Sequence, residues 1–378
     1  MRIAVANWTS RHFGGAETYL GTVLPGLTRA GCDTALLSEV DTPSDRDRIL
    51  LSAGSPLWCI AEPGLSAMLD ALRRWNPDVL YVHQITQPHL EHELLKVAPA
   101  VLFAHNYQGT CISGSKLTRL PIPTPCSRRF GPQCLMHYFP KRCGGLSPLT
   151  MLSLYREQLE RRTNLEKYRM ILTASDHMRL EYLRNGLVPE AVRTIYPPIA
   201  AVSEPHNGDG KLQAPVSDAG AGLDRPWRLT FVGRMTPVKG GAELLDSIPQ
   251  VWRALGRPIA VTFAGDGPER ARWEAAARRV QARHEAIQVS FSGWINAVQL
   301  HALFAASDLL VVPSVWPEPF GFVGPEAGLH GVPAAGFAVG GIPGLTEAAA
   351  SERKWGKSAG RSIPRRPEPP WTPKSPTE

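Results

Sequence analysis

The sequence predicts an α/β protein with two domains, each built on a sheet of parallel strands. In both halves of the chain, short apolar runs alternate with longer helical segments, which is the pattern of βαβ units. The alternation stops over residues 200–226, where Gly, Pro, Ser, Asp and Asn are frequent, and it resumes at Trp227. We therefore predict domains at 1–199 and 227–350, joined by a flexible linker. A chain of 378 residues that is 43% hydrophobic can fill two such cores.

The first half begins with a strand at 2–6, which leads to Gly14, Gly15 and then a helix with Leu20 and Leu24 on one face. Further strands are predicted at 34–37, 78–82, 100–104 and 170–175. The free amides at such a helix start can receive a phosphate group. The glycine spacing is not the G-x-G-x-x-G fingerprint of dinucleotide sites.

In the second half, the strand at 228–232 is followed by a basic loop and a helix. Arg234 in this loop offers a planar fork of donors and Lys239 a point charge, a pair suited to a diphosphate. Further strands are predicted at 259–263, 287–291 and 308–312, and Gly265 follows the first of these in a turn at a helix start, where amides can face a nucleotide. The alternative is that Arg and Lys serve solubility alone.

Two glutamates follow the strand at 308–312. Glu318 comes soon after its carboxyl end, where open α/β sheets bind ligands, and Glu326 falls at the start of the next helix. Gly321, between them, lets main-chain amides approach a ligand closely. This spacing indicates a sugar-nucleotide site in which one carboxylate binds the sugar and the other the ribose. Ordinary capping and surface acids are the alternative.

Two histidines follow neighbouring strands of the first half. His83 ends one strand and His105 the next, so both are expected at the same edge of the sheet. A histidine there can act on a substrate proton or a donor phosphate. The alternative for each is a half-buried histidine that serves packing.

These motifs together resemble the retaining, nucleotide-sugar-dependent glycosyltransferases of family 4, over roughly residues 1–347. The resemblance rests on Gly14 to Glu17, on Gly233-Arg234 with Lys239-Gly240, and on the element from Glu318 to Glu326 that ends in Gly340-Gly341-Ile342-Pro343. It implies the glycosyltransferase B architecture, two Rossmann-like domains facing across a cleft.

By the same resemblance, Arg234 and Lys239 contact the donor diphosphate, Glu318 the sugar and Glu326 the ribose, and His105 faces the cleft. The implied reaction transfers a sugar from a UDP- or GDP-sugar to a hydroxyl with retention of configuration and needs no metal or other cofactor. Surface polysaccharide or glycolipid assembly, with a glycan or lipid-linked acceptor, is the expected setting. A sugar-nucleotide epimerase is an alternative.

A cysteine-rich basic insertion is predicted at 106–148, without regular structure. It holds Cys111, Cys126, Cys134 and Cys143, which could hold a structural zinc as four thiolates. Their spacings differ from those of common zinc knuckles, so buried unpaired cysteines and redox bridges are alternatives. The insertion is also a candidate surface for a lipid-linked or phosphorylated acceptor near a membrane. A loop with merely solvated charges is the remaining interpretation.

After Ala350 the alternating pattern ends, and 351–378 is rich in Pro, Arg, Lys and Ser, which predicts a disordered tail. The family pattern continues at this point with a further strand and helices. We therefore expect a second domain lacking its last elements, with a frameshift or premature end as the hypothesis. An inactive truncated relic or a binding-only pseudoenzyme is the corresponding functional alternative.

Composition limits the location and the partners. The sequence has no run of eighteen apolar residues and no cleavable leader pattern at its start, which predicts a cytoplasmic protein. The net charge of +7 favours a phosphorylated ligand or an anionic membrane, as in peripheral contact at the inner membrane face. No aromatic-interleaved basic patch is present, so we predict no nucleic-acid partner.

Overall fold

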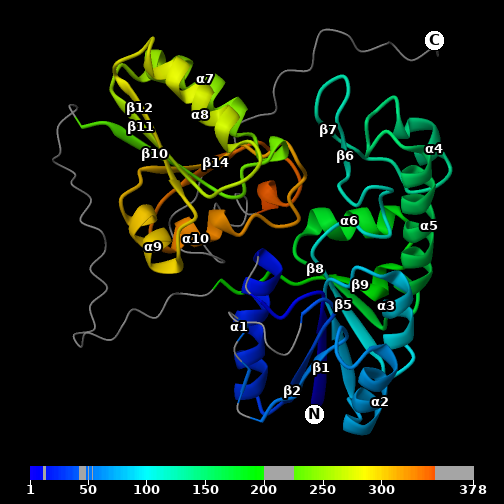
Figure 1. The fold of residues 1–378 in the computed structure, drawn as a ribbon. Coiled ribbons are helices and arrows are strands. Elements are labelled where there is room, and N and C mark those ends of the chain that lie inside the picture. The colour runs from blue at the N-terminus through cyan, green and yellow to red at the C-terminus, as the bar shows by residue number, and fades with distance from the viewer. Residues whose placement is uncertain (12–13, 42–47, 50, 53, 200–224, 345–378) are drawn as a thin grey trace, which may run out of the picture. The chain divides into compact units, whose positions relative to one another are not determined.

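The structure, a computed structural model, describes residues 1–344 except 12–13, 42–47, 50, 53 and 200–224 (Figure 1). Nearly all of the predicted linker and the whole predicted tail therefore lie outside the described residues, as does the point at which the last family elements were expected to be lost. The chain divides into two compact units, Met1–Ala200 and Ala201–Glu378.

Unit 1 is a parallel seven-stranded sheet with helices on both faces. Its elements are β1 (Arg2–Asn7), α1 (Gly15–Arg29), β2 (Asp33–Ser38), β3 (Leu57–Cys59), α2 (Leu65–Trp75), β4 (Val79–Val82), α3 (Pro88–Leu94), β5 (Ala100–Ala104), β6 (Leu117–Thr118), β7 (Thr124–Pro125), α4 (Gln133–Tyr138), α5 (Pro148–Leu165), β8 (Met170–Thr173), α6 (Asp176–Arg184) and β9 (Val192–Thr194). The strand order is β3-β2-β1-β4-β5-β8-β9. Figure 1 shows α1 on one face and α2 and α3 on the other. This arrangement confirms the predicted βαβ pattern.

Local sequence explains where the helices of unit 1 begin. Ser147 precedes α5 and its hydroxyl accepts a hydrogen bond from the Thr150 amide, while Pro148 supplies a φ suited to the first turn. Ser175 caps α6 in the same way. The core strand β1 is buried along all but its first residue, as expected for a strand covered on both faces.

The insertion at 106–148 differs from the prediction because it contains regular structure. β6 and β7 form an antiparallel hairpin, and α4 follows it and packs on α5. A small cluster of Ile112, Phe130 and Tyr138 is buried beneath them. These elements could not be predicted from the sequence, because each is only two to six residues long and shows no periodicity.

Unit 2 is a parallel five-stranded sheet with helices on both faces. Its elements are β10 (Trp227–Val232), η2 (Pro237–Lys239), α7 (Gly241–Leu255), β11 (Ile259–Ala264), α8 (Arg270–Gln281), β12 (Ile287–Gly293), α9 (Ala297–Ala305), β13 (Leu309–Val312), α10 (Val323–Leu329) and β14 (Ala334–Gly336). The strand order is β12-β11-β10-β13-β14. In Figure 1, α7 and α8 cover one face and α9 and α10 the other.

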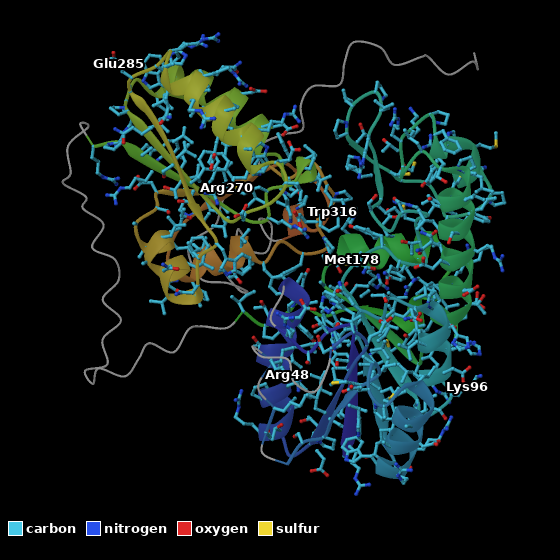
Figure 2. The ribbon with its side chains drawn as sticks, viewed as in Figure 1. Arg48, Lys96, Met178, Arg270, Glu285 and Trp316 are labelled. Carbon is cyan, nitrogen blue, oxygen red and sulfur yellow. The ribbon has the colours of Figure 1, made fainter. Side chains whose placement is uncertain are left out.

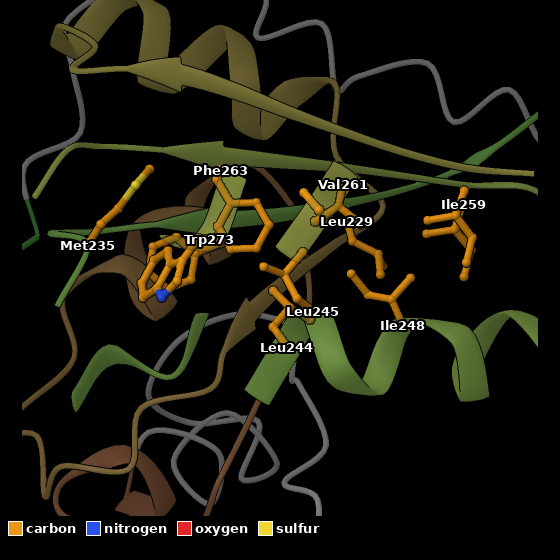
Figure 3. Packing of buried hydrophobic residues seen from close by; sticks show 12 residues of the cluster. Leu229, Met235, Leu244, Leu245, Ile248, Ile259, Val261, Phe263 and Trp273 are labelled. Carbon is orange, nitrogen blue, oxygen red and sulfur yellow. The ribbon is translucent and has the colours of Figure 1, made fainter. Parts of the chain in front are cut away.

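The core of unit 2 lies between α7, α8 and the strands β10 and β11. Figure 3 shows Leu245 and Ile248 of α7 directed at the strands, with the Trp273 ring beside Phe263. Trp273 is 1% exposed, and its ring centroid lies 5.8 Å from that of Phe263. This packing holds the start of α7 close to the sheet edge.

The helix α7 is flanked by two glycines with similar left-handed backbones, Gly240 at φ 74° and Gly256 at φ 65°. A Cβ on Gly240 would lie 1.7 Å from the Pro313 carbonyl oxygen, whereas a Cβ on Gly256 would meet nothing within 4 Å. Only the first glycine therefore permits a close approach of two backbone segments.

We predict that Gly256→Ala destabilises the protein by about 1–2 kcal/mol, the cost of a side chain in the left-handed region. Gly240→Ala should cost a further 1–3 kcal/mol, because the added methyl group forces the Pro313 segment away. Urea unfolding of both variants measures the difference. Equal losses in the two variants would contradict the close approach.

Candidate functional site

The predicted residues of unit 2 gather at the switch point of its sheet. β10 lies between β11 and β13, and all three strands run parallel, so the loops that follow them leave from one edge. Arg234 and Lys239 follow β10, Gly265 follows β11, and Glu318 follows β13. This is the edge at which open α/β sheets bind ligands.

The loops after β10 and β13 are hydrogen-bonded to each other. The Val238 carbonyl accepts from the Val315 amide at 3.0 Å and from the Ser314 hydroxyl at 3.2 Å. Trp316, labelled in Figure 2, donates its amide to the same carbonyl at 3.3 Å. The backbone thus fixes where the side chains of both loops begin.

Lys239 and Glu318 form an ion pair across this junction. The Lys239 Nζ donates to the Glu318 Oε1 at 2.6 Å and lies 5.5 Å from the centroid of the Trp316 ring. Glu318 is only 6% exposed. A buried carboxylate needs such a partner, because an unpaired charge is costly to bury. The two residues predicted to touch diphosphate and sugar are therefore in contact with each other.

Glycines let the backbones of this edge come close together. A Cβ on Gly265 would lie 2.1 Å from the Gly233 carbonyl oxygen, and one on Gly340 would lie 2.4 Å from the Glu318 amide nitrogen. The Gly341 amide also donates to the Glu318 carbonyl at 2.6 Å. Gly321 has φ 94°, so it turns the chain before α10. These contacts fix the position of Glu318.

Arg234 and Glu326 are both available to a ligand. Arg234 is exposed, and no ion pair within the described ranges engages its guanidinium. Glu326 is half-buried in the first turn of α10, and no hydrogen bond between described residues reaches its carboxylate. Desolvation raises the pKa of this carboxyl above its usual value. A ligand that donates hydrogen bonds would relieve that cost.

The predicted residues of unit 1 gather at the carboxyl edge of its sheet. Gly14 caps α1 in an extended conformation, and both Gly14 and Gly15 are exposed after β1. Glu17 is 2% exposed and accepts hydrogen bonds at 3.0 Å from the side chains of Asn7 and Trp8. Glu17 therefore ties the helix start to the end of β1.

His83 and His105 contact each other, as expected from neighbouring strands. The His83 Nδ1 lies 2.9 Å from the His105 Nε2, and one of these nitrogens donates to the other. Burial lowers the pKa of His83 well below its usual value and that of His105 to about 3, so both rings are neutral at physiological pH. Two nitrogens lie outside this contact, the His105 Nδ1 and the His83 Nε2, and the latter is buried without a hydrogen-bond partner among the described residues.

Both histidines line a pocket of unit 1 together with polar side chains of the same unit. Arg161 and Glu91 lie in its wall, with Arg161 Nη1 3.6 Å from Glu91 Oε2, and Gln108 and Asn106 contribute further polar groups. Glu91 and Arg161 could not be predicted as pocket residues from the sequence, because they lie on different helices, α3 and α5, and 70 residues apart. Sequence analysis also did not identify Trp316, although this residue stands only two positions before Glu318.

The four cysteines of the insertion are near one another, and all are free thiols. Burial raises the pKa of Cys143 to about 11, and the neighbouring Cys111, Cys126 and Cys134 add to this effect. In the part of the chain that the structure describes, no group of three or more His, Cys, Asp or Glu side chains is placed to hold a metal. Zinc binding stays a prediction, and metal analysis of the purified protein tests it.

The raised pKa of Glu326 gives a prediction about stability. Between the usual pKa and the raised one, the unfolded chain has released the proton that the folded chain keeps, so stability falls as pH rises through this window. We expect Glu326→Gln to melt at a higher temperature than the parent protein at pH 7, with the difference vanishing below pH ~4, near the ordinary glutamate pKa.

Melting curves at several pH values measure this effect. Glu243→Gln, a change in the first turn of α7, is the control. A lower melting temperature for Glu326→Gln at pH 7 would contradict the proposed cost of the buried carboxylate.

Two family models match the chain, Glycosyltransferase Family 4 over residues 13–201 and Glycosyl transferases group 1 over residues 219–352. An uncharacterized glycosyltransferase of Methanocaldococcus jannaschii is 33% identical over 114 residues, which are 30% of this chain and 28% of that protein. A 2-deoxystreptamine N-acetyl-D-glucosaminyltransferase of Streptomyces fradiae is 28% identical over 347 residues, 87% of this chain and 72% of that protein.

A solved structure shares the fold. The crystal structure of Anabaena HepE in complex with UDP and glucose has a TM-score of 0.57 and 17% sequence identity, and it covers 91% of this chain and 83% of that one. Within the described residues, no helix is long and apolar enough to cross a membrane. Because the two family models together match most of its length, the chain belongs to the family 4 and group 1 glycosyltransferases, transferases with a Rossmann-like α/β fold.

Proposed function

We propose that this protein transfers a sugar from a nucleoside diphosphate sugar, a UDP- or GDP-sugar, to a hydroxyl acceptor with retention of configuration. The observation that carries the proposal is the ion pair of Lys239 and Glu318 at the switch point of unit 2, formed by a loop that also carries the exposed Arg234. Two cations at this edge can neutralise a leaving diphosphate, and one buried acid can accept hydrogen bonds from the hydroxyl groups of the sugar ring.

Each residue has a separate role in this proposal. Arg234 and Lys239 neutralise the diphosphate as it departs, Glu318 orients the sugar, and Glu326 accepts hydrogen bonds from the ribose. Lys239 must turn from Glu318 toward the phosphates, which leaves the Glu318 carboxylate to the sugar hydroxyls. The transition state is oxocarbenium-like, and catalysis is mostly stabilisation of charge. The scheme needs no metal or other cofactor.

His105 acts in this scheme as a neutral group. Because its pKa is about 3, it carries no charge that could balance a phosphate at pH 7. Its Nδ1 can exchange a hydrogen bond with a sugar or acceptor hydroxyl, and His83 fixes the ring by bonding the Nε2. Gly14 and Gly15 offer exposed backbone at the start of α1, the helix whose Tyr19 ring contacts both histidines.

The acceptor is proposed to be a glycan or lipid-linked hydroxyl in surface polysaccharide or glycolipid assembly, with the enzyme in the cytoplasm. The Streptomyces fradiae relative is named for a sugar transfer to 2-deoxystreptamine, and the HepE structure holds UDP and glucose. These names support a nucleotide-sugar donor and a hydroxylated ring as acceptor.

Thermal unfolding with and without millimolar UDP, GDP and ADP tests the donor site. A nucleotide at about 100 times its Kd adds roughly 2.7 kcal/mol of stability, which raises Tm by about 5–11 °C for units of this size. The bound nucleotide then defines the donor for acceptor screens, and proton NMR of the product reports the anomeric configuration. A protein that no nucleotide stabilises, or a product of inverted configuration, would contradict the proposal. Conversion of the donor sugar without any acceptor would instead indicate an epimerase.

We predict that Arg234→Ala lowers kcat/KM on the order of a hundredfold, the loss expected for one preorganised donor to a developing negative charge. Arg272→Ala removes an exposed arginine from α8 of the same unit and should leave turnover unchanged. Steady-state kinetics with the identified donor measure both variants. An Arg234→Ala enzyme within a few-fold of the parent would rule out the diphosphate contact.

A further inference from the structure

Large apolar side chains are exposed together in the insertion and the start of α5. Leu149 is 79% exposed, Met136 75% and Leu146 64%. The set is completed by Leu120, Ile122 and Leu152. We call these six side chains the apolar patch. Isolated exposed leucines are ordinary on a protein surface, but a group of six within 33 residues of sequence indicates a contact surface.

Several contacts join the parts that carry this patch into one body. The amides of Arg119 and Leu120, at the end of the β6–β7 hairpin, donate to the Lys141 carbonyl at 2.8 Å and 3.3 Å. α4 packs on α5, and the cluster of Ile112, Phe130 and Tyr138 lies beneath. Figure 1 shows α4, the start of α5 and the hairpin at the same end of unit 1.

The patch on α5 lies on the side of the helix that faces away from the protein. Leu149 and Leu152 are three positions apart, so they share one side of the helix. The side that includes Gln158, Arg161 and Leu165 is buried instead. The two leucines are therefore available to a partner without any change in the fold.

The charge of the segment that carries the patch is predominantly basic. The sequence contains no Asp or Glu from residue 94 to residue 156. The surrounding basic residues that reach the surface are Arg119, Arg128, Arg129, Lys141, Arg142 and Arg156. Lys116 is excluded from this group because it is buried and paired with Glu181 at 2.8 Å. The patch is thus an apolar area whose neighbours in the insertion are basic, and the acids Glu157 and Glu160 follow only further along α5.

We propose that this surface docks on an anionic lipid bilayer, with the apolar side chains in the outer acyl region and the surrounding basic residues on the headgroups. An apolar face flanked by Arg and Lys is the chemistry of interfacial membrane binding. A second copy of the chain fits less well, because a symmetric contact through this surface would bring two sets of basic residues together. Nucleic acid would pair with the basic residues but leave the apolar side chains exposed.

This inference does not depend on the proposed function, because its test contains neither donor nor acceptor. Full-length protein is mixed with vesicles of phosphatidylcholine alone, or with 30 mol% phosphatidylglycerol, at about 150 mM salt, an ionic strength at which surface charges are screened within about 8 Å. Flotation on a density gradient measures the bound fraction. The parent protein should float with the anionic vesicles and much less with the neutral ones.

Two paired variants identify the surface. Arg128→Gln with Arg129→Gln should weaken binding about thirtyfold, from roughly fivefold for each basic residue at an anionic surface. Leu149→Ser with Leu152→Ser should weaken it at least tenfold, because Leu loses its apolar contact with the acyl region. The controls are Arg73→Gln with Arg74→Gln on α2, and Leu180→Ser on α6, which is 55% exposed.

Each outcome decides the matter. Binding that fails in both insertion variants and survives in both controls supports the proposal. The proposal is overturned if the parent protein fails to float with anionic vesicles, or if the insertion variants bind as well as the controls. Self-association that the Leu149 and Leu152 changes abolish, seen by sedimentation without vesicles, would also overturn it in favour of a dimer surface. Unchanged circular dichroism and Tm show that all variants are folded.

Discussion

The ion pair between Lys239 and Glu318 is the interaction on which the organisation of unit 2 depends. It joins the loops that follow β10 and β13. These two strands are neighbours in the sheet, and the switch point lies between them. Burial of Glu318 makes the pair necessary, and the glycines at 240, 265 and 340 let the backbones come close enough to form it. In the proposed function, donor binding separates this pair, and the diphosphate and the sugar take over the two partners.

Unit 1 has different electrostatics at the carboxyl edge of its own sheet. There two histidines hydrogen-bond to each other and remain neutral because they are buried, and the ion pair of Arg161 with Glu91 lines the same pocket. A neutral imidazole can exchange hydrogen bonds with hydroxyl groups without attracting anions. The insertion begins directly after His105 and carries further basic residues near exposed leucines.

Much of this could be predicted from the sequence, because parallel strands buried on both faces are continuous apolar runs and their carboxyl ends share an edge. Arg234, Lys239, Glu318 and His105 were predicted at these edges in this way, and the structure brings Lys239 to Glu318 and His105 to His83. The contact of Lys239 with Glu318 could not be predicted, since 79 residues separate them and only the sheet order places them together. β3, β9 and β14 were missed because three residues give no periodicity. The hairpin of the insertion was missed because its two-residue strands depend on long-range hydrogen bonds to Lys141.

Calorimetric titration of UDP into the Lys239→Met and Glu318→Gln variants tests the central claim most directly. If Lys239 turns from Glu318 to the diphosphate, Lys239→Met should bind UDP more weakly by on the order of tenfold or more, the loss of a charged hydrogen bond. Glu318→Gln should bind UDP at least as tightly as the parent protein, because the lysine is no longer held by a carboxylate, while sugar transfer is lost. Equal loss of UDP binding in both variants would contradict the account, since it would mean that the ion pair only maintains the fold of the two loops.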